Sequence, residues 1–154
     1  MKHLVALALL ASACEESPCG PSEGKVTRIL DGDTVELEDG RKIRYLLVDT
    51  PETSDGDCFA ENAKQFNSDL VLNKNITLQY DVECEDRFGR TLAYVSVGGM
   101  EVNTLMISRG YACVLHISPD GDARLDEFKA LELDAQRAGR GLWGMCNPLP
   151  PACK

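Results

Sequence analysis

The sequence predicts an α+β domain in which a small antiparallel β-barrel carries attached helices. Three strand-like segments with alternating apolar residues come first, one helical segment separates them from two further strand patterns, and helical spacing follows. The chain has 154 residues, of which 44% are hydrophobic and 27% are charged. This is enough for one globular domain and leaves little room for a second.

The first three predicted strands are residues 25–30, 34–38 and 41–48. The first stops at Asp31-Gly32, which is a turn dipeptide. The second stops at Asp39-Gly40, the strongest short-range hairpin signal. The third is apolar on nearly both faces, as expected of a strand with barrel core on one side and a helix on the other.

The remaining predicted elements are a helix at 59–72, strands at 75–80 and 91–97, a short helix at 102–109 and a longer helix at 122–138. The first helix rests on the spacing of Phe59, Ala63 and Phe66. Gly110 and Gly139 mark the ends of the other two. Five strands and about three helices in this order are the composition of a five-stranded OB-fold β-barrel with attached helices.

The charge of the chain excludes one class of function. Lys and Arg total 16 against 25 Asp and Glu, so the formal net charge is −9. A protein that binds polyanions through a basic coat needs the opposite sign. Any polyanion would therefore have to be bound by positive charge supplied locally.

Residues 1–13 have the pattern of an export signal. A positive start precedes the apolar run 4–10, and small residues follow at Ala11-Ser12-Ala13. The apolar run is much shorter than the roughly 20 residues that span a bilayer. Three alternatives remain open: lipidation of Cys14, cleavage after Ala13 without lipidation, and a misassigned start.

The sequence from Leu10 to Cys14 resembles a bacterial lipobox. We therefore expect a membrane-anchored lipoprotein, periplasmic or at the cell surface, or a secreted protein if cleavage occurs without lipidation. Residues 14–24 then form a polar tether, 25–146 the folded domain and 147–154 a Pro/Cys-rich tail.

Seven cysteines are unusual for a reduced cytosolic protein of this length. Setting Cys14 aside leaves an even number, which supports an oxidising compartment and up to three disulfides. No Cys-x-x-Cys pair exists and the two histidines are remote from each other, which disfavours a zinc cluster.

Acids and arginines recur at the ends of the predicted strands. They are Asp31-Gly32-Asp33-Thr34, Arg44, Asp49-Thr50-Pro51-Glu52 and Asp86-Arg87-Phe88-Gly89-Arg90. Each motif alone is typical of a turn, a corner or a surface position. Together and in this order they resemble the staphylococcal nuclease (thermonuclease) family over about residues 26–143, and the run 44–52 is the most specific part.

The resemblance implies an OB-fold barrel that cleaves phosphodiesters of DNA and RNA with one Ca²⁺. By position, Asp33 and Asp49 match the carboxylate ligands of the metal, and Thr50 offers its backbone carbonyl. Asp31 matches a nearby acid that helps to shape the metal site. Hard oxygen ligands of this kind suit Ca²⁺.

The same resemblance assigns the catalytic residues. Glu52 matches the general base that activates a water for attack on phosphorus. Arg44 and Arg90 match two arginines whose planar forks bind phosphate oxygens and stabilise the transition state. The implied products have 3′-phosphate ends.

Two positions are predicted to contact the substrate. Arg87 stands where the family has a lysine, and His116 stands near the place of a tyrosine that packs around the nucleotide. The resemblance implies single-stranded nucleic acid as the preferred substrate and a monomeric protein. The altered residues predict changed nucleotide affinity with the chemistry retained.

The resemblance also suggests disulfide partners. Cys58 and Cys84 are each six residues from a catalytic candidate, so we expect them to join the two active-site loops. Cys113 and Cys146 are expected to pair near the family's terminal tryptophan, here Trp143. Cys19 and Cys153 would then join the two ends of the domain.

Two alternatives to a nuclease stay open. One is a non-catalytic, nuclease-like module that binds nucleic acid, and the other is a periplasmic structural lipoprotein. The five residues Asp33, Arg44, Asp49, Glu52 and Arg90 favour the enzyme because a binding module does not need all of them.

One further acidic segment suggests a second Ca²⁺ loop. Asp120-Gly121-Asp122 is followed by Asp126 and Glu127, but the spacing of an EF-hand is absent. The segment is more typical of a helix start, where acids interact favourably with the helix dipole.

Overall fold

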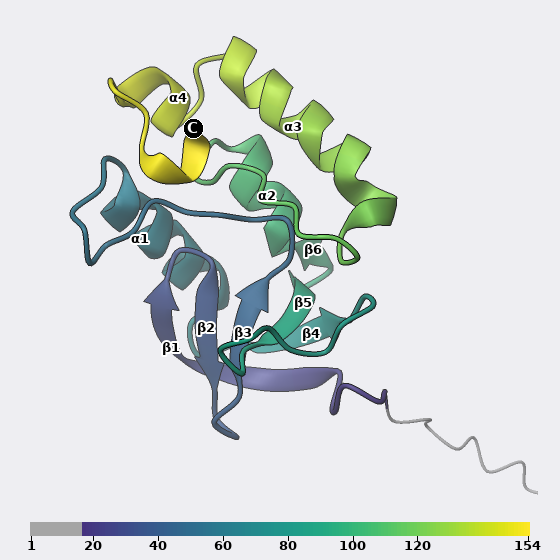
Figure 1. Ribbon diagram of the computed structural model, residues 1–154. Helices are drawn as coiled ribbons and strands as arrows, with labels where there is room; N and C mark the ends of the chain where they lie inside the picture. The colour runs from purple at the N-terminus through teal and green to yellow at the C-terminus, as the bar shows by residue number, and fades with distance from the viewer. Residues whose placement is uncertain (1–16) are drawn as a thin grey trace, which may run out of the picture.

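Five strands close into a barrel in the computed structural model, which describes residues 17–154 (Figure 1). They are β1 (Glu23–Asp31), β2 (Thr34–Leu37), β3 (Lys42–Tyr45), β4 (Asn75–Gln79) and β5 (Thr91–Val97). The strand order is β3-β2-β1-β4-β5, and parallel pairing of β3 with β5 closes the ring. A two-residue strand, β6 (Met100–Glu101), pairs with β5. The predicted α+β OB-fold barrel is confirmed.

The longest strand, β1, pairs with two other strands of the barrel, β4 and β2. Its first residues pair with β4, where Glu23 lies opposite Thr77, and its second half pairs with β2 as far as Asp31 opposite Thr34. Two register shifts interrupt the pairing with β2. Such irregularities bend a strand, which allows β1 to pair with both neighbours.

The helices gather on one side of the barrel (Figure 1). They are α1 (Ala60–Val71), α2 (Val102–Ser108), α3 (Leu125–Arg137) and α4 (Leu142–Met145), with 3₁₀ turns at Asp122–Arg124 and Pro151–Cys153. The sequence patterns predicted the first three and missed α4, which is only four residues long. The predicted helix at 122–138 begins as the 3₁₀ turn and becomes α-helical at Leu125.

The third strand is shorter than predicted. It ends at Tyr45 instead of continuing to residue 48 because Leu47 has a φ of 59°, which is incompatible with a continuing strand. Leu46, Leu47 and Val48 are nevertheless buried. Their apolar character therefore reflects burial of a turn and not a longer strand.

A buried asparagine joins α2 to the barrel. The Asn103 side chain accepts the backbone N–H of Val95 at 2.8 Å and donates to the carbonyl of Leu46 at 2.9 Å. Asn103 is fully buried, where unpaired polar groups are costly. Its hydrogen bonds fix the turn after β3 against β5.

Three disulfides use all six cysteines of the described residues: Cys19–Cys84, Cys58–Cys146 and Cys113–Cys153. The expected number is confirmed, and three bridges are typical of an extracellular or exported protein. The expected partners Cys58–Cys84, Cys113–Cys146 and Cys19–Cys153 are wrong.

The pairing follows from how the two ends of the domain fold back. The C-terminal segment packs Cys113, Cys146, Leu142 and Cys153 into one small apolar cluster, which brings Cys113 to Cys153. Phe59 packs against the same cluster, so its neighbour Cys58 reaches Cys146. Cys84 then pairs with Cys19 of the N-terminal segment. Residues 147–154 are therefore tied to the core through Cys153.

The segment before β1 is also fixed to the barrel. The Pro21 carbonyl accepts hydrogen bonds from Arg41 Nη1 at 2.7 Å and from the Tyr80 hydroxyl at 2.5 Å. β1 begins at Glu23, so the last two residues of the predicted tether belong to the sheet. The predicted signal peptide, residues 1–13, and Cys14 lie outside the described residues.

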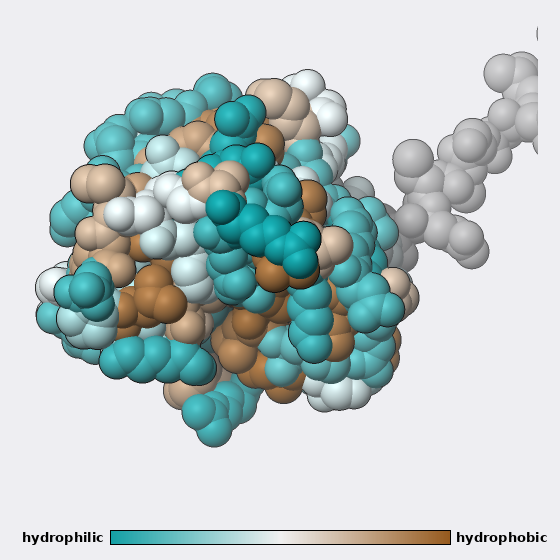
Figure 2. Space-filling model, turned by 90° about the horizontal axis from the view of Figure 1, so that it is seen from above, coloured by the Kyte–Doolittle hydropathy of each residue, from teal (hydrophilic) through white to brown (hydrophobic). Residues whose placement is uncertain are grey.

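Within residues 17–154, no helix is long and apolar enough to cross a membrane. From above, hydrophilic side chains cover much of the surface, and hydrophobic ones gather in limited areas between them (Figure 2).

Candidate active site

A cleft of about 900 Å³ brings the predicted site residues together. Its walls include Asp31, Asp33, Arg44, Asp49, Glu52, Arg87 and Arg90. These residues come from the end of β1, the β1–β2 turn, β3, the loop after β3 and the loop before β5. Closure of the barrel places these segments side by side although they are far apart in the sequence.

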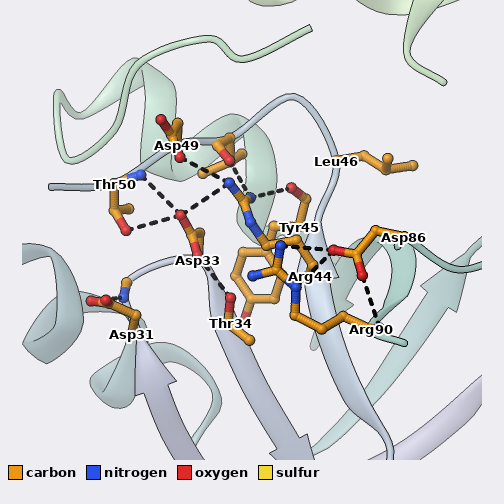
Figure 3. Close-up of polar contacts among 12 residues, drawn as sticks. Asp31, Asp33, Thr34, Arg44, Tyr45, Leu46, Asp49, Thr50, Asp86 and Arg90 are labelled. Atoms are coloured by element: carbon orange, nitrogen blue, oxygen red, sulfur yellow. Dashed lines mark hydrogen bonds and ion pairs between the residues drawn. The ribbon is translucent and has the colours of Figure 1, made fainter. Parts of the chain in front are cut away.

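Asp33 lies at the centre of the hydrogen-bond network (Figure 3) and is 4% exposed. Its Oδ2 accepts the backbone N–H of Thr50 at 3.0 Å and the Thr50 hydroxyl at 3.1 Å, and its Oδ1 accepts the Thr34 hydroxyl at 2.8 Å. A Cβ on Gly32 would lie 2.7 Å from Thr50 Cγ2. Only glycine at that position lets the β1–β2 turn approach Thr50 so closely.

Arg44 joins two carboxylates and also holds the backbone of the turn after β3. Its Nη2 lies 3.3 Å from Asp33 Oδ2 and 2.9 Å from Asp49 Oδ1. Its Nη1 donates to the carbonyl of Tyr45 at 2.8 Å and to that of Val48. The buried guanidinium is therefore fixed by the fold before any substrate binds.

Two carboxylates of the cleft, Asp49 and Glu52, have raised pKa values. Burial, together with the negative charges of Asp33 and Asp31, raises the pKa of Asp49 to about 6, although Arg44 and Arg90 act in the opposite direction. Burial, a hydrogen bond with Asp31 and the neighbouring negative charges raise the pKa of Glu52 to about 7. Burial is the largest cause of both shifts, and the negative charges of neighbouring carboxylates add to it.

Eight acidic and four basic side chains line the cleft. Among residues 17–154, however, no three His, Cys, Asp or Glu side chains are arranged as a ready-made metal cluster. Instead, the Arg44 guanidinium lies between Asp33 and Asp49. Oxygen atoms remain free for a further ligand, since Asp49 Oδ2 and the Thr50 carbonyl have no hydrogen-bond donor among the described residues. The set of oxygen donors fits a hard cation.

Arg90 is held in place by Asp86, which belongs to the sequence motif but is not among the predicted site residues. Asp86 Oδ2 accepts Arg90 Nε and Nη2, both at 2.7 Å, and its Oδ1 accepts the backbone N–H groups of Phe88 and Arg90 at 2.9 and 3.0 Å. The signal was an aspartate three residues before a turn glycine and four residues before an arginine. Asp86 therefore orients the arginine within its own turn.

The two predicted substrate contacts lie in different places. Arg87 lines the cleft and its Cζ lies 4.8 Å from the centroid of the Phe88 ring. His116 does not line the cleft, and its Nε2 lies 2.6 Å from Asp122 Oδ1. Its neighbours Leu115 and Ile117 line the cleft instead. Alternate residues of an extended segment face opposite sides, so Leu115 and Ile117 face the cleft and His116 faces away from it.

Comparison with known proteins gives the same family as the sequence motifs. The family model described as Staphylococcal nuclease homologue matches residues 42–145, more than half of the chain. Endonuclease YncB of Bacillus subtilis (strain 168) is 35% identical over 124 residues, which cover 75% of this chain and 59% of that protein. The chain thus spans less than two thirds of that relative's length.

Two further relatives are covered over more of their length. An Escherichia coli protein named as an uncharacterized endonuclease is 35% identical over 137 residues, covering 86% of this chain and 84% of that protein. The Thermonuclease of Staphylococcus hyicus is 31% identical over 126 residues, covering 77% of this chain and 74% of that protein. The resemblance carried by the acids and arginines is confirmed, and the chain belongs to the staphylococcal nuclease family.

Proposed function

We propose that this protein is a Ca²⁺-dependent nuclease that hydrolyses the phosphodiester bonds of DNA and RNA. The observation that carries the proposal is the cleft in which the carboxylates of Asp31, Asp33, Asp49 and Glu52 lie with two arginines. The names of the relatives, endonuclease and thermonuclease, support the same activity.

The cation site is proposed at Asp33, Asp49 and the Thr50 carbonyl, with Asp31 beside them. The free oxygens support it, and so do the negative charges of Asp33 and Asp31 beside Asp49, which a bound cation would offset. Bound Ca²⁺ would supply positive charge that favours a hydroxide-like nucleophile and offsets the charge of the phosphate.

The reaction uses three of the chain's own side chains. Glu52, at the exposed rim of the cleft, accepts a proton from the attacking water, whose oxygen forms the new bond to phosphorus. Arg44 and Arg90 stabilise the negative charge on the phosphate oxygens in the transition state. The bond between phosphorus and the 5′ oxygen breaks, which leaves a 3′-phosphate on one product, and the departing 5′ oxygen takes a proton from water to become the hydroxyl of the other product.

Single-stranded substrate is proposed because the cleft has an apolar rim. Three of the exposed large hydrophobic side chains, Phe88, Leu115 and Ile117, line it, with exposures of 68%, 40% and 69%. Unpaired bases can contact such side chains, whereas the bases of a duplex are stacked and covered. We also propose a monomer, and lipidation of Cys14 at an exported N-terminus.

Replacement of Phe88 by alanine should raise the KM for single-stranded DNA about fivefold or more, because a stacked base contributes about 1–3 kcal/mol. The kcat should change by less than about threefold, because Asp86 holds Arg90 in place. Steady-state kinetics with an oligonucleotide measure both. The Phe88→Tyr variant keeps the ring and is the control, and an unchanged KM in Phe88→Ala would contradict the apolar rim.

Digestion of single-stranded DNA by the full chain tests the proposed activity. Cleavage is expected with Ca²⁺, its loss with excess chelator, and its return when Ca²⁺ is added again. Cleavage that continues unchanged in excess chelator would overturn the proposed cation dependence. If the protein binds the DNA and does not cleave it under any condition, it is instead a binding module.

A further inference from the structure

The turn between the cleft-lining Ile117 and α3 contains a buried carboxylate that the proposed chemistry does not use. Asp120 is 5% exposed, and its Oδ1 accepts the backbone N–H groups of Val82 and Glu83, both at 2.9 Å. Burial of a carboxylate is costly unless hydrogen bonds compensate for it. The partners here are two amides at the start of the loop that carries Arg90.

The contact between the two segments is reciprocal. Asp81 Oδ2 accepts the backbone N–H of Gly121 at 2.7 Å. Gly121 has a φ of 81°, and a Cβ on it would lie 2.5 Å from Leu47 Cδ2. The turn at residues 120–121 is thus packed between the Arg90 loop and the turn after β3, which leads to Asp49.

Backbone pairing connects the anchored residues to Arg90. The Cys84 carbonyl accepts the N–H of Leu92 at 2.9 Å, Glu85 pairs with Thr91, and the Asp86 N–H donates to the Arg90 carbonyl at 3.0 Å. Residues 84–92 therefore form a hairpin whose turn carries Arg90, and the residues directly before its base, Val82 and Glu83, are held by Asp120. A shift at the base would move the guanidinium relative to the carboxylates.

We infer that Asp120 is a positioning residue for Arg90: by holding Val82 and Glu83, it sets where the hairpin places the guanidinium in the cleft. The inference rests on the proposed function, in which Arg90 stabilises the transition state. Asp81 supports the same contact from the other side.

The test is a double-mutant cycle on the full chain. Asp120→Ala should lower kcat about 10- to 100-fold with KM within about threefold, because misplacement of about 1 Å can cost 10²-fold. In the Arg90→Ala background, assayed at high enzyme concentration, Asp120→Ala should lower kcat by less than about twofold, since no guanidinium remains to be positioned. Asp120→Asn keeps an acceptor oxygen and should retain most of the wild-type kcat.

Glu132→Ala is the matched control. Glu132 Oε1 accepts the backbone N–H of Val114 at 2.8 Å, so it too is a carboxylate that holds a backbone amide, but it makes no hydrogen bond to residues 84–92. The Glu132→Ala variant should have a lower Tm and an unchanged kcat, and its effect should not be coupled to that of Arg90→Ala.

An equal loss of kcat from Asp120→Ala in both backgrounds, or a lower Tm with unchanged kcat, would overturn the inference. If Asp120→Ala does not fold, Asp81→Ala removes the reciprocal hydrogen bond and is used in the same cycle. An inactive wild type with Ca²⁺ would overturn the proposed function instead, so the two failures are distinguishable.

Discussion

Replacement of Glu52 by glutamine is expected to lower kcat about 10²- to 10⁴-fold, the contribution typical of a general base. Glutamine has nearly the same shape but cannot take a proton from water. The fold should persist, because Glu52 is exposed and its backbone, not its side chain, makes the hydrogen bond to Asp57 Oδ2 at 3.0 Å. Turnover of single-stranded DNA at saturating Ca²⁺ and thermal unfolding measure the two effects.

The matched control is Asp55→Asn in the same loop. It also removes one negative charge, but Asp55 is exposed and does not line the cleft. Its kcat should stay within about threefold of the wild type, as is usual for a surface position outside the reacting groups. Near-normal turnover in Glu52→Gln would remove Glu52 from the proposed mechanism.

Reduction of the three disulfides is expected to unfold the protein at 37 °C. The bridges close sequence separations of 65, 88 and 40 residues. Loss of a native disulfide from a small domain costs about 2–5 kcal/mol, and the total stability of a domain is about 5–15 kcal/mol. Near-UV circular dichroism and nuclease assays of the oxidised and the reduced, alkylated protein check this, and a Tm unchanged by reduction would contradict it.

Two paired variants separate the bridges. Cys113→Ser with Cys153→Ser removes the bridge to the C-terminal segment and should lower the Tm alone. Cys19→Ser with Cys84→Ser frees the first residue of the hairpin that carries Arg90, so it should lower kcat as well. Equal kcat in the two variants would show that this bridge does not act on the active site.

The local patterns predicted most elements because alternation and helical spacing record which side of each segment is buried. They failed where a segment is buried without being part of a strand or a helix. Leu46, Leu47 and Val48 have the apolar pattern of a strand, yet the left-handed Leu47 turns the chain and all three are buried in that turn. Residues 151–153 form a 3₁₀ turn that depends on docking by the Cys153 bridge.

The sequence by itself determined the family, the barrel with its helices, and the acids and arginines that the barrel gathers into one cleft. These follow from residue type and order, which the chain carries locally. Only the tertiary structure decided the disulfide partners and the contact between Asp120 and the loop that carries Arg90. It also decided that Leu115 and Ile117, and not His116, line the cleft. Each depends on which distant segments become neighbours when the barrel closes and the two ends fold back. The spacing of residues along the sequence does not determine how close such segments lie in space.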